Sequence, residues 1–331
     1  MKPDERSRID ALLRNVAAGK IAAAHHSAAA QDSVLQTEPF FPRTAGKGQA
    51  EIYSVFPGVD AAYLTFQAPE VAFRHAPSSG VLELFHCHSG RVGWNMQGGM
   101  AIYLGAGDMT VHSAACCADS TMMFPLGYVE GISLTIDPQR LAANLPEALH
   151  EANFRPQELL SAFCHGKPVA IPACPPLAGL FAPLYSARPA LRGAYLHLKI
   201  QELLLYLRDL PPEQLATSRY SSQQAEWIKK IHRQLTEHLD QRFTIEALAR
   251  QYLINTSTLK EVFKAVYGLP IATYMKEYRM RQAMKLLRET DASIADIAAK
   301  VGYETQGKFT QAFKTAAHAL PTEYRKQHGQ R

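Results

Sequence analysis

One pattern occurs twice in the last third of the sequence, and it restricts the possible fold more than any other feature. Each copy has a capping residue, a short apolar helix, a turn and a second capped helix, over residues 243–268 and 293–319. The copies lie about 50 residues apart, a period typical of a duplicated supersecondary unit. The sequence therefore predicts two helix-turn-helix units in an all-α region.

The ends of these helices are marked by specific residues. Thr244 and Asn255 are expected to cap the two helices of the first copy, and Gly268 to end it. Ser293 and Thr305 are the corresponding caps of the second copy. Between the copies, residues 272–290 predict a helix of about 18 residues, ~27 Å long. Such a spacer could hold two recognition helices about one turn of DNA apart, ~34 Å.

Positive charge is concentrated in the same region. Residues 221–331 contain 18 Lys or Arg and 11 Asp or Glu, a net charge of +7. Residues 1–220 contain 17 Lys or Arg and 19 Asp or Glu, a net charge of −2, so the net charge of the whole chain is +5. A basic module on a mildly acidic body predicts a polyanionic partner, most often nucleic acid.

The length and composition exclude several other classes. At 331 residues, 47% hydrophobic and 20% charged, the chain is too long for one ordinary domain and is neither disordered nor low in complexity. We expect no membrane span and no cleaved signal, because charges interrupt every apolar stretch. Five cysteines, two of them adjacent, favour a reducing cytoplasm.

The first part of the chain is predicted to be rich in β-structure. Short alternating segments predict an antiparallel meander that forms a small barrel or sandwich, with Gly98-Gly99 in a tight hairpin turn. The expected strands are 61–67, 81–88, 92–97, 100–104, 109–112 and 131–136. Residues 193–210 then predict a helix with an apolar stripe, ended by Pro211-Pro212.

These observations give a fold class of α+β and a division of the chain. Residues 1–210 are expected to form a β-rich domain with helices, which the family resemblance described below implies is a cupin-like ligand-sensing and dimerisation domain, and residues 225–331 are expected to form a basic helical domain that binds DNA. Residues 211–224, which are small and polar, are expected to be the linker.

The stretch from Trp227 to Arg325 resembles the DNA-binding domain of the AraC/XylS family of bacterial transcription regulators over nearly its whole length. The resemblance rests on FTIEALA and LINTSTLKEVFKAVYGLP, on YMKEYRMRQAMKLL in the spacer, and on SIADIAAKVGYETQGKFTQAFK followed by PTEYR. One position departs from the family. Ala317-His318-Ala319 follows the second recognition helix, where the family has an aromatic residue and a glycine.

The resemblance implies which side chains contact DNA. Gln pairs well with adenine, Lys with guanine and Glu with cytosine, whereas phosphate contacts fix the register without reading sequence. The alternative for each residue is an ordinary solvated side chain on a polar helix face. The residues expected to face bases are Ser257, Lys260, Glu261, Gln306, Gly307, Lys308 and Gln311. Those expected to hold phosphates are Lys264, Lys314 and Arg325.

Within the family, the sequence resembles the siderophore-responsive regulators of the pyochelin and yersiniabactin type. TLKEVFKAVYG, TQGKFTQAFK, LELFHCHSGRVGW and the stretch from Pro125 to Ile132 carry this likeness. It implies a cupin-like barrel that binds a small molecule, expected to be a ferric siderophore. A barrel mouth suited to a polar aromatic chelate would contain His86, His88, Arg91 and Trp94. The alternative is that these residues are barrel core or a solvated strand end.

The two histidines also raise the question of a metal. His86 and His88 lie two residues apart in a predicted strand, so they share the face of Leu82 and Leu84 and could point into the barrel. A metal-binding cupin would add a Glu a few residues on and a further His, but Arg91, Trp94 and Gln97 occupy that stretch, and His112 is the one plausible third ligand. We therefore favour structural histidines and predict no metal and no cofactor.

Two enzyme classes are alternatives to a transcription regulator. DNA-repair methyltransferases with an AraC-type half need a four-Cys zinc site or a Pro-Cys-His-Arg motif, and the cysteines here match neither. A metal-dependent cupin enzyme with an atypical site is the remaining enzymatic alternative. We predict no catalytic residues and no enzymatic activity.

The sequence thus predicts a cytoplasmic DNA-binding transcription regulator that activates siderophore or iron-uptake genes. An AraC-type regulator of another metabolic or virulence pathway, with a different ligand, is the alternative. The expected partners are double-stranded promoter DNA, RNA polymerase, a small-molecule effector and a second copy of the chain, with no membrane. The dimer is expected to use the helix that carries Leu203, Leu204, Leu205 and Leu207, because one stripe packed on a barrel would need fewer apolar residues. The alternative is that this helix packs wholly on its own barrel.

Overall fold

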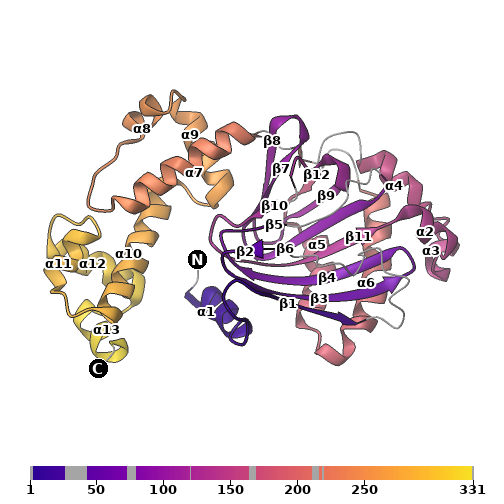
Figure 1. Ribbon diagram of the computed structural model, residues 1–331, viewed down its shortest axis with the longest axis horizontal. Coiled ribbons are helices and arrows are strands. Elements are labelled where there is room, and N and C mark those ends of the chain that lie inside the picture. Colours follow the sequence, from indigo (N-terminus) through magenta and orange to yellow (C-terminus); the bar gives the residue numbers. More distant parts are fainter. Residues whose placement is uncertain are drawn as a thin grey trace. The chain divides into compact units, whose positions relative to one another are not determined.

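The computed structural model describes residues 3–26, 43–72, 80–119, 121–163, 169–210, 216–217 and 220–329 (Figure 1). The chain divides into two compact units, Lys2–Ser222 and Gln223–Arg331. Half of the predicted linker, residues 211–215 and 218–219, lies outside the described residues, as does Cys164. None of the helices described is both long enough and apolar enough to cross a membrane.

The N-terminal unit is built on an eight-stranded sheet with the order β1-β3-β4-β11-β6-β9-β12-β13. All of its pairings are antiparallel except that of β1 with β3, which is parallel. Its strands are β1 (Ile21–His26), β3 (Lys47–Phe56), β4 (Val59–Gln67), β6 (Leu82–Gly90), β9 (Met109–Ser113), β11 (Val129–Ile136), β12 (Val169–Ile171) and β13 (Ala216–Thr217).

A second, six-stranded sheet has the order β14-β8-β7-β10-β5-β2. Its strands are β2 (Arg43–Thr44), β5 (Glu70–Ala72), β7 (Val92–Met96), β8 (Met100–Leu104), β10 (Thr121–Met123) and β14 (Tyr220–Ser221). The β7–β8 hairpin turns at Gly98 and Gly99, whose φ angles of 75° and 72° are the left-handed values that glycine tolerates. This confirms the predicted hairpin.

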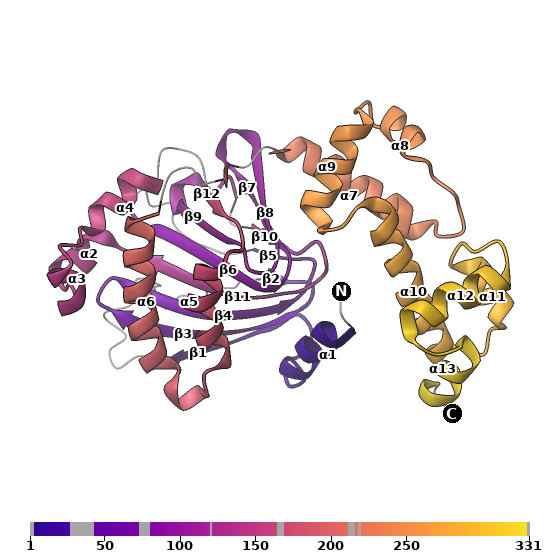
Figure 2. The same ribbon diagram turned by 180° about the vertical axis from the view of Figure 1, so that it is seen from behind.

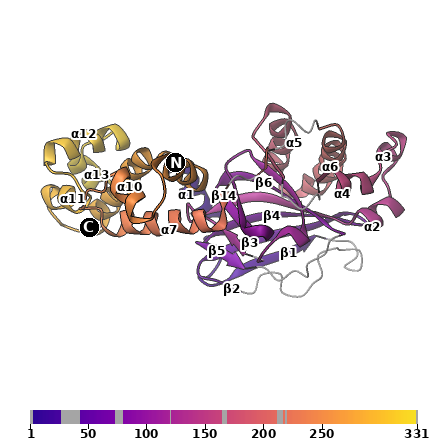
Figure 3. The same cartoon turned by 90° about the horizontal axis from the view of Figure 1, so that it is seen from above.

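The helices of this unit lie mainly against the outer face of the large sheet. Figures 2 and 3 show α5 and α6 crossing that face, with β2 and β5 of the small sheet on the other side. The helices are α1 (Pro3–Leu12), α2 (Pro138–Ala143), α3 (Glu147–Glu151), α4 (Pro156–Phe163), α5 (Pro175–Ser186) and α6 (Arg192–Arg208). Short 3₁₀ turns occur at η2 (Gln97–Gly99), η3 (Ala114–Cys116) and η4 (Pro189–Leu191).

Two apolar cores result from this layering. The helix-side core joins β6, β9 and β11 to the helices, through residues such as Leu82, Leu84 and Leu177. The inter-sheet core joins the two sheets, through residues such as Phe85 and Trp94. Because successive side chains of a strand point to opposite faces, even-numbered residues of β6 up to Leu84 face the helices and odd-numbered ones face the other sheet.

The predicted strands are present, but the predicted meander is wrong. β6 pairs with β9 and β11, whereas β7, its neighbour in sequence, belongs to the other sheet. Among the described residues the pairings give two open sheets and do not close a cupin-like barrel. The predicted apolar helix is α6, and its stripe is buried against its own unit.

The C-terminal unit consists of helices (Figure 1). In it α10 packs against α9, α11, α12 and α13, and thus joins two groups of helices. Its helices are α7 (Ser222–Glu237), α8 (Ile245–Gln251), α9 (Thr256–Tyr267), α10 (Ile271–Glu289), α11 (Ile294–Lys300), α12 (Gln306–Ala317) and α13 (Pro321–His328).

Candidate nucleic-acid interface and sensor residues

The first helix-turn-helix unit is formed by α8 and α9. The Thr244 hydroxyl accepts a hydrogen bond from the Ala247 N–H at 3.1 Å, and Asn255 Oδ1 accepts one from the Thr258 N–H at 2.7 Å. The second helix ends at Gly268, with φ at +84°. Each of the predicted caps is therefore confirmed, and α9 is fixed at both ends.

The second unit, α11 and α12, repeats this construction. The Ser293 hydroxyl accepts from the Asp296 N–H at 3.0 Å, and the Thr305 hydroxyl from the Lys308 N–H at 3.3 Å. Helix α12 ends at His318, which takes the left-handed conformation with φ at +55° and donates its N–H to the Lys314 carbonyl. His318 thus replaces the expected glycine without changing the C-cap geometry.

One face of each second helix is buried and the opposite face is exposed. Helix α9 buries Leu259, Val262, Phe263 and Val266, and α12 buries Phe309 and Phe313. This leaves the predicted DNA-contacting residues in solvent. The exposed ones are Ser257, Lys260, Glu261, Lys264, Gln306, Gly307, Lys308, Gln311 and Lys314.

Two of these side chains already have partners. The Ser257 hydroxyl donates to Asn255 Oδ1 at 2.7 Å, which draws Ser257 into the cap of α9. Lys308 Nζ lies 3.0 Å from Glu304 Oε2, and this contact lowers the pKa of the fully exposed Glu304 carboxyl. Exposed pairs of this kind contribute little to stability, so Lys308 can exchange Glu304 for another anion.

Arg325 differs from the other predicted phosphate contacts. It is half-buried on α13, and its guanidinium donates to the Ala292 carbonyl just before α11. The side chain therefore holds α13 against the second helix-turn-helix unit. Its role toward DNA stays a prediction.

Helix α10 connects the two helix-turn-helix units, and at 19 residues it is ~28 Å long. Its Arg279 donates to the carbonyl oxygens of Gly302 and Leu239, both at 3.1 Å. Gly302 lies in the turn of the second unit, and Leu239 follows α7, which packs with the first. One guanidinium thus ties the two halves of the C-terminal unit together.

The four predicted ligand-binding residues are not gathered at one place in the N-terminal unit. His86 stacks on Phe181 of α5 with ring centroids 3.9 Å apart, and its Nδ1 lies 3.0 Å from the Tyr185 hydroxyl. His88 stacks on Tyr185, also at 3.9 Å. Both histidines therefore face the helices rather than the space between the sheets, which contradicts the expectation that they point into a barrel.

The surroundings of these histidines favour their neutral form. Burial, with a smaller effect from His88, lowers the pKa of His86 to about 3. Burial also lowers the pKa of His88. Trp94, in contrast, lies in the inter-sheet core, edge-on to Phe85 at 5.4 Å. Arg91 is half-buried at the β6–β7 turn beside Gly105, where burial lowers its pKa.

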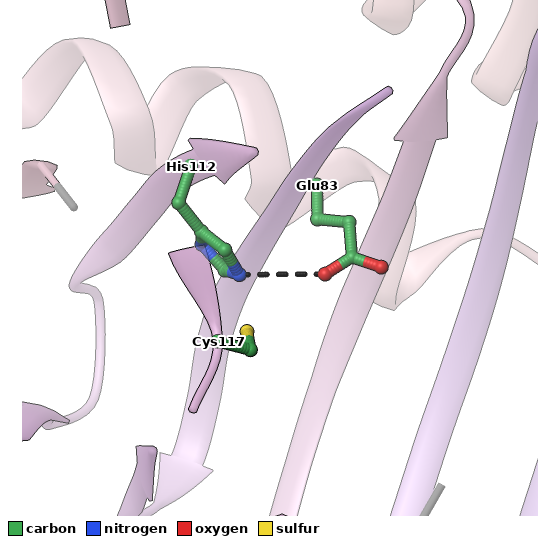
Figure 4. A group of neighbouring side chains, drawn as sticks. All are labelled: Glu83, His112 and Cys117. Atoms are coloured by element: carbon green, nitrogen blue, oxygen red, sulfur yellow. Dashed lines mark ion pairs between the residues drawn. The ribbon is translucent and has the colours of Figure 1, made fainter. Parts of the chain in front are cut away.

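A cluster that the sequence analysis missed lies between the sheets, in the large sheet's inner face (Figure 4). Glu83 of β6 and His112 of β9 are direct partners in the antiparallel ladder, and Cys117 joins them through a bridge to Met96 of β7. Glu83 Oε2 lies 3.4 Å from His112 Nε2, and the thiol completes a group whose donor atoms are all within 4.8 Å of one another.

His112 and Cys117 are each unusual within this cluster. His112 is 3% exposed, and its Nδ1 is buried without a hydrogen-bond partner among the described residues. Burial and the nearby Glu83 carboxylate raise the pKa of the Cys117 thiol to about 12. The predicted third ligand, His112, is therefore on the opposite face of the sheet from His86 and His88, and its neighbours are Glu83 and Cys117.

Comparison with known proteins identifies similarity in the C-terminal unit. A family profile described as a helix-turn-helix domain matches residues 248–327. The transcriptional activator RhaR of Mannheimia succiniciproducens is 30% identical over 38% of this chain and 44% of its own length. The regulator ExsA of Pseudomonas aeruginosa is 28% identical over 39% of this chain and 46% of its own length. The arabinose operon regulatory protein of Escherichia coli is 28% identical over 30% of this chain and 34% of its own length.

The C-terminal unit contains a helix-turn-helix domain. The matched residues run from within α8 to α13, so the helix-turn-helix match includes α9, α12 and the α10 connection. The chain spans less than half the length of these curated relatives. They are named as transcriptional regulators, and their names fix no ligand for the N-terminal unit.

Proposed function

We propose that this chain is a DNA-binding transcription regulator, with promoter DNA held by α9 and α12 of the AraC-type domain. The observation that carries the proposal is the pair of capped helices that bury their apolar faces and leave Lys, Gln, Ser and Glu in solvent. The net charge of +7 in residues 221–331 supports it, because phosphate neutralisation supplies much of the affinity for DNA.

In this proposal the two helices enter successive major grooves on one side of the duplex. Bases would be read by residues such as Lys260 of α9 and Gln311 of α12, while Lys264 and Lys314 hold phosphates. RNA polymerase and a second copy of the chain are the proposed protein partners, and activation is the proposed sign of regulation.

The test is selection of bound DNA from a random library by the full chain, followed by footprinting of the selected sequence. Two protected half-sites about 10 base pairs apart are expected. Gln311→Ala should lower affinity for the selected sequence by roughly 10-fold or more and leave affinity for random DNA unchanged, because a lost base contact removes discrimination. Gln327→Ala, on the exposed side of α13, is the control.

Enrichment of no sequence, or equal losses on selected and random DNA, would contradict sequence-specific recognition by α12. Failure of Gln327→Ala to match the unchanged protein would show that any exposed Gln in the domain has the same effect. Both results are read at a fixed salt concentration, because affinity for DNA depends steeply on it.

We further propose that the N-terminal unit binds a small-molecule effector in a cupin-like sensor, and that a ferric siderophore is the first class to test. Support comes from the sequence resemblance to siderophore-responsive regulators. Calorimetric titration of the full chain with ferric and iron-free siderophores tests it. We expect the original chain to release or absorb heat on binding a siderophore, and His88→Ala or Arg91→Ala to remove this heat. If the chain binds no class of siderophore, the siderophore proposal is wrong and the DNA-binding proposal is unaffected.

A further inference from the structure

We propose that Glu83, His112 and Cys117 form a zinc-binding site in the N-terminal unit, with a fourth coordination position left open. The cluster combines a carboxylate, an imidazole and a thiol at the end of the inter-sheet core (Figure 4). This proposal concerns metal binding alone and does not depend on the DNA-binding function.

The donor set determines which cation fits. Thiolate and imidazole are ligands that Zn²⁺ prefers, whereas Ca²⁺ and Mg²⁺ require oxygen donors. Zinc sites with three protein ligands keep their fourth position for water or another molecule. A single Cys with one His and one Glu is therefore a chemically complete three-ligand set.

The geometry is close to that of a tetrahedral site. Zinc bonds of about 2.0 to 2.3 Å place neighbouring donor atoms roughly 3.3 to 3.8 Å apart. The 3.4 Å separation between Glu83 and His112 lies in this range, and the remaining separations, none above 4.8 Å, are closed by small side-chain movements. The β6–β9 ladder and the Met96–Cys117 bridge fix the backbone of all three residues.

An ordinary ion pair explains only part of the arrangement. Glu83 and His112 could pair if the imidazole were protonated, but such a pair gives no role to a thiol beside the same carboxylate. A cation bound at His112 Nε2 would contact the imidazole, the carboxylate and the sulfur together.

Cobalt(II) titration of the chelator-treated full chain tests the proposal, because a Co²⁺–thiolate bond gives a charge-transfer absorption that oxygen and nitrogen ligands do not. We expect this band together with visible bands of tetrahedral Co²⁺, both removed by one equivalent of Zn²⁺. Cys117→Ser should abolish the charge-transfer band and weaken Zn²⁺ binding by roughly tenfold or more.

Cys116→Ser is the matched control. Cys116 is adjacent in sequence and also half-buried, but it is not part of the cluster, so its replacement should leave the Co²⁺ spectrum and the Zn²⁺ affinity unchanged. Glu83→Gln should retain the charge-transfer band and weaken binding. The proposal is wrong if the original chain shows no charge-transfer band. It is also wrong if Cys116→Ser loses the band and Cys117→Ser keeps it.

A measurement on the unaltered protein covers the case in which a variant fails to fold. Zn²⁺ should slow alkylation of Cys117 by at least tenfold and leave alkylation of Cys116 unchanged, as measured by peptide mass spectrometry. Trp94 gives a second location signal, because its ring lies 6.2 Å from His112. In a Trp227→Phe background, Co²⁺ should quench Trp94 fluorescence. The Co²⁺ concentration at half-maximal quenching should equal the concentration at half of the absorption change. Equal protection of both cysteines, or no quenching, contradicts a site at His112.

Discussion

The carbonyl oxygen of Leu239 occupies the space that a side chain on Gly302 would need. A Cβ built on Gly302 would lie 2.0 Å from this oxygen and 2.9 Å from the guanidinium carbon of Arg279. Gly302 also has a φ of +79°, which other residues rarely adopt. The close approach of the turn of the second helix-turn-helix unit to the segment after α7 therefore depends on the missing side chain.

Gly302→Ala should lower the free energy of unfolding of the C-terminal unit by more than about 1 kcal/mol, because both the contact and the backbone conformation are incompatible with a Cβ. Gly307→Ala is the control, since nothing lies within 4 Å of its added Cβ and helical Gly→Ala substitutions stabilise by roughly 0.5–1 kcal/mol. Urea unfolding followed by Trp227 fluorescence in a Trp94→Phe background measures both. Equal stabilities of the two variants would contradict the steric argument.

His318→Gly should stabilise the C-terminal unit by roughly 0.5–1 kcal/mol. His318 ends α12 in the left-handed region, where glycine has no steric penalty. Ala316→Gly, two residues earlier and inside the helix, should have the opposite effect by a similar amount. The same urea unfolding experiment distinguishes them, and destabilisation by both substitutions would show that the His318 imidazole stabilises the cap.

The stability of the C-terminal unit should fall as the pH falls from about 6.5 to 4. Burial, and less strongly the positive charge of Arg281, lowers the pKa of His232 to about 4. Its ring stacks on Tyr267 at 4.3 Å, and its Nε2 lies 2.8 Å from the Tyr274 hydroxyl. Between the two pKa values the unfolded chain binds a proton that the folded chain does not, which costs up to about 1.4 kcal/mol per pH unit.

His232→Gln keeps a donor toward Tyr274 and does not titrate. The difference in unfolding free energy between the original chain and this variant should therefore shrink as the pH is lowered through that window, and be constant above pH 7. Urea unfolding at several pH values measures it. Parallel stability curves would show that His232 is protonated in the folded chain at its ordinary pKa.

Lys314→Ala should make DNA binding less sensitive to salt. Each phosphate neutralised by the protein contributes roughly −0.9 to the slope of log affinity against log salt concentration, so the slope should change by about one. Lys199→Ala removes the same charge from the N-terminal unit, where Lys199 pairs with Glu202 at 2.8 Å, and should leave the slope unchanged. Identical slopes for both variants would place Lys314 away from the phosphates.

Leu198, rather than Leu203, is the residue through which α6 could join two chains. Leu203, Leu204 and Leu207 are buried in their own unit, and Leu205 packs partly on the same core, so the predicted use of these leucines for dimerisation is wrong. Leu198 is 67% exposed. Leu198→Lys should leave circular dichroism unchanged and lower the mass measured by analytical ultracentrifugation, whereas Leu203→Lys should unfold the N-terminal unit. An unchanged mass for folded Leu198→Lys would exclude a dimer through this helix.

The local features of the C-terminal unit could be predicted from sequence, because their signals lie within a few residues of the atoms they position. The side chains of Thr244, Asn255, Ser293 and Thr305 each cap a helix that begins at the next residue. The contact between Gly302 and Leu239 could not be predicted, because it joins residues that are distant in sequence and bears no periodic signal.

The cluster of Glu83, His112 and Cys117 in the N-terminal unit could not be predicted from sequence. The sequence indicated that His86 and His88 share a face with Leu84, and this is correct, but periodicity does not say which face of a strand is covered by helices. Glu83, His112 and Cys117 come together only because β6 pairs with β9 in one register and Met96 pairs with Cys117. A shift of one residue in the β6–β9 register would separate them.

The contacts of Arg279 with three carbonyl groups have a consequence for the spacing of the proposed DNA half-sites. Its guanidinium also lies 3.5 Å from the Gln241 carbonyl, in addition to those of Leu239 and Gly302, so it links the turn before α12 to the segment between α7 and α8. One inserted base pair would move the distal half-site by ~3.4 Å along the duplex and turn it by roughly 34°. For the DNA binding proposed above, we therefore expect a site with one base pair inserted between its half-sites to bind more weakly than the original site.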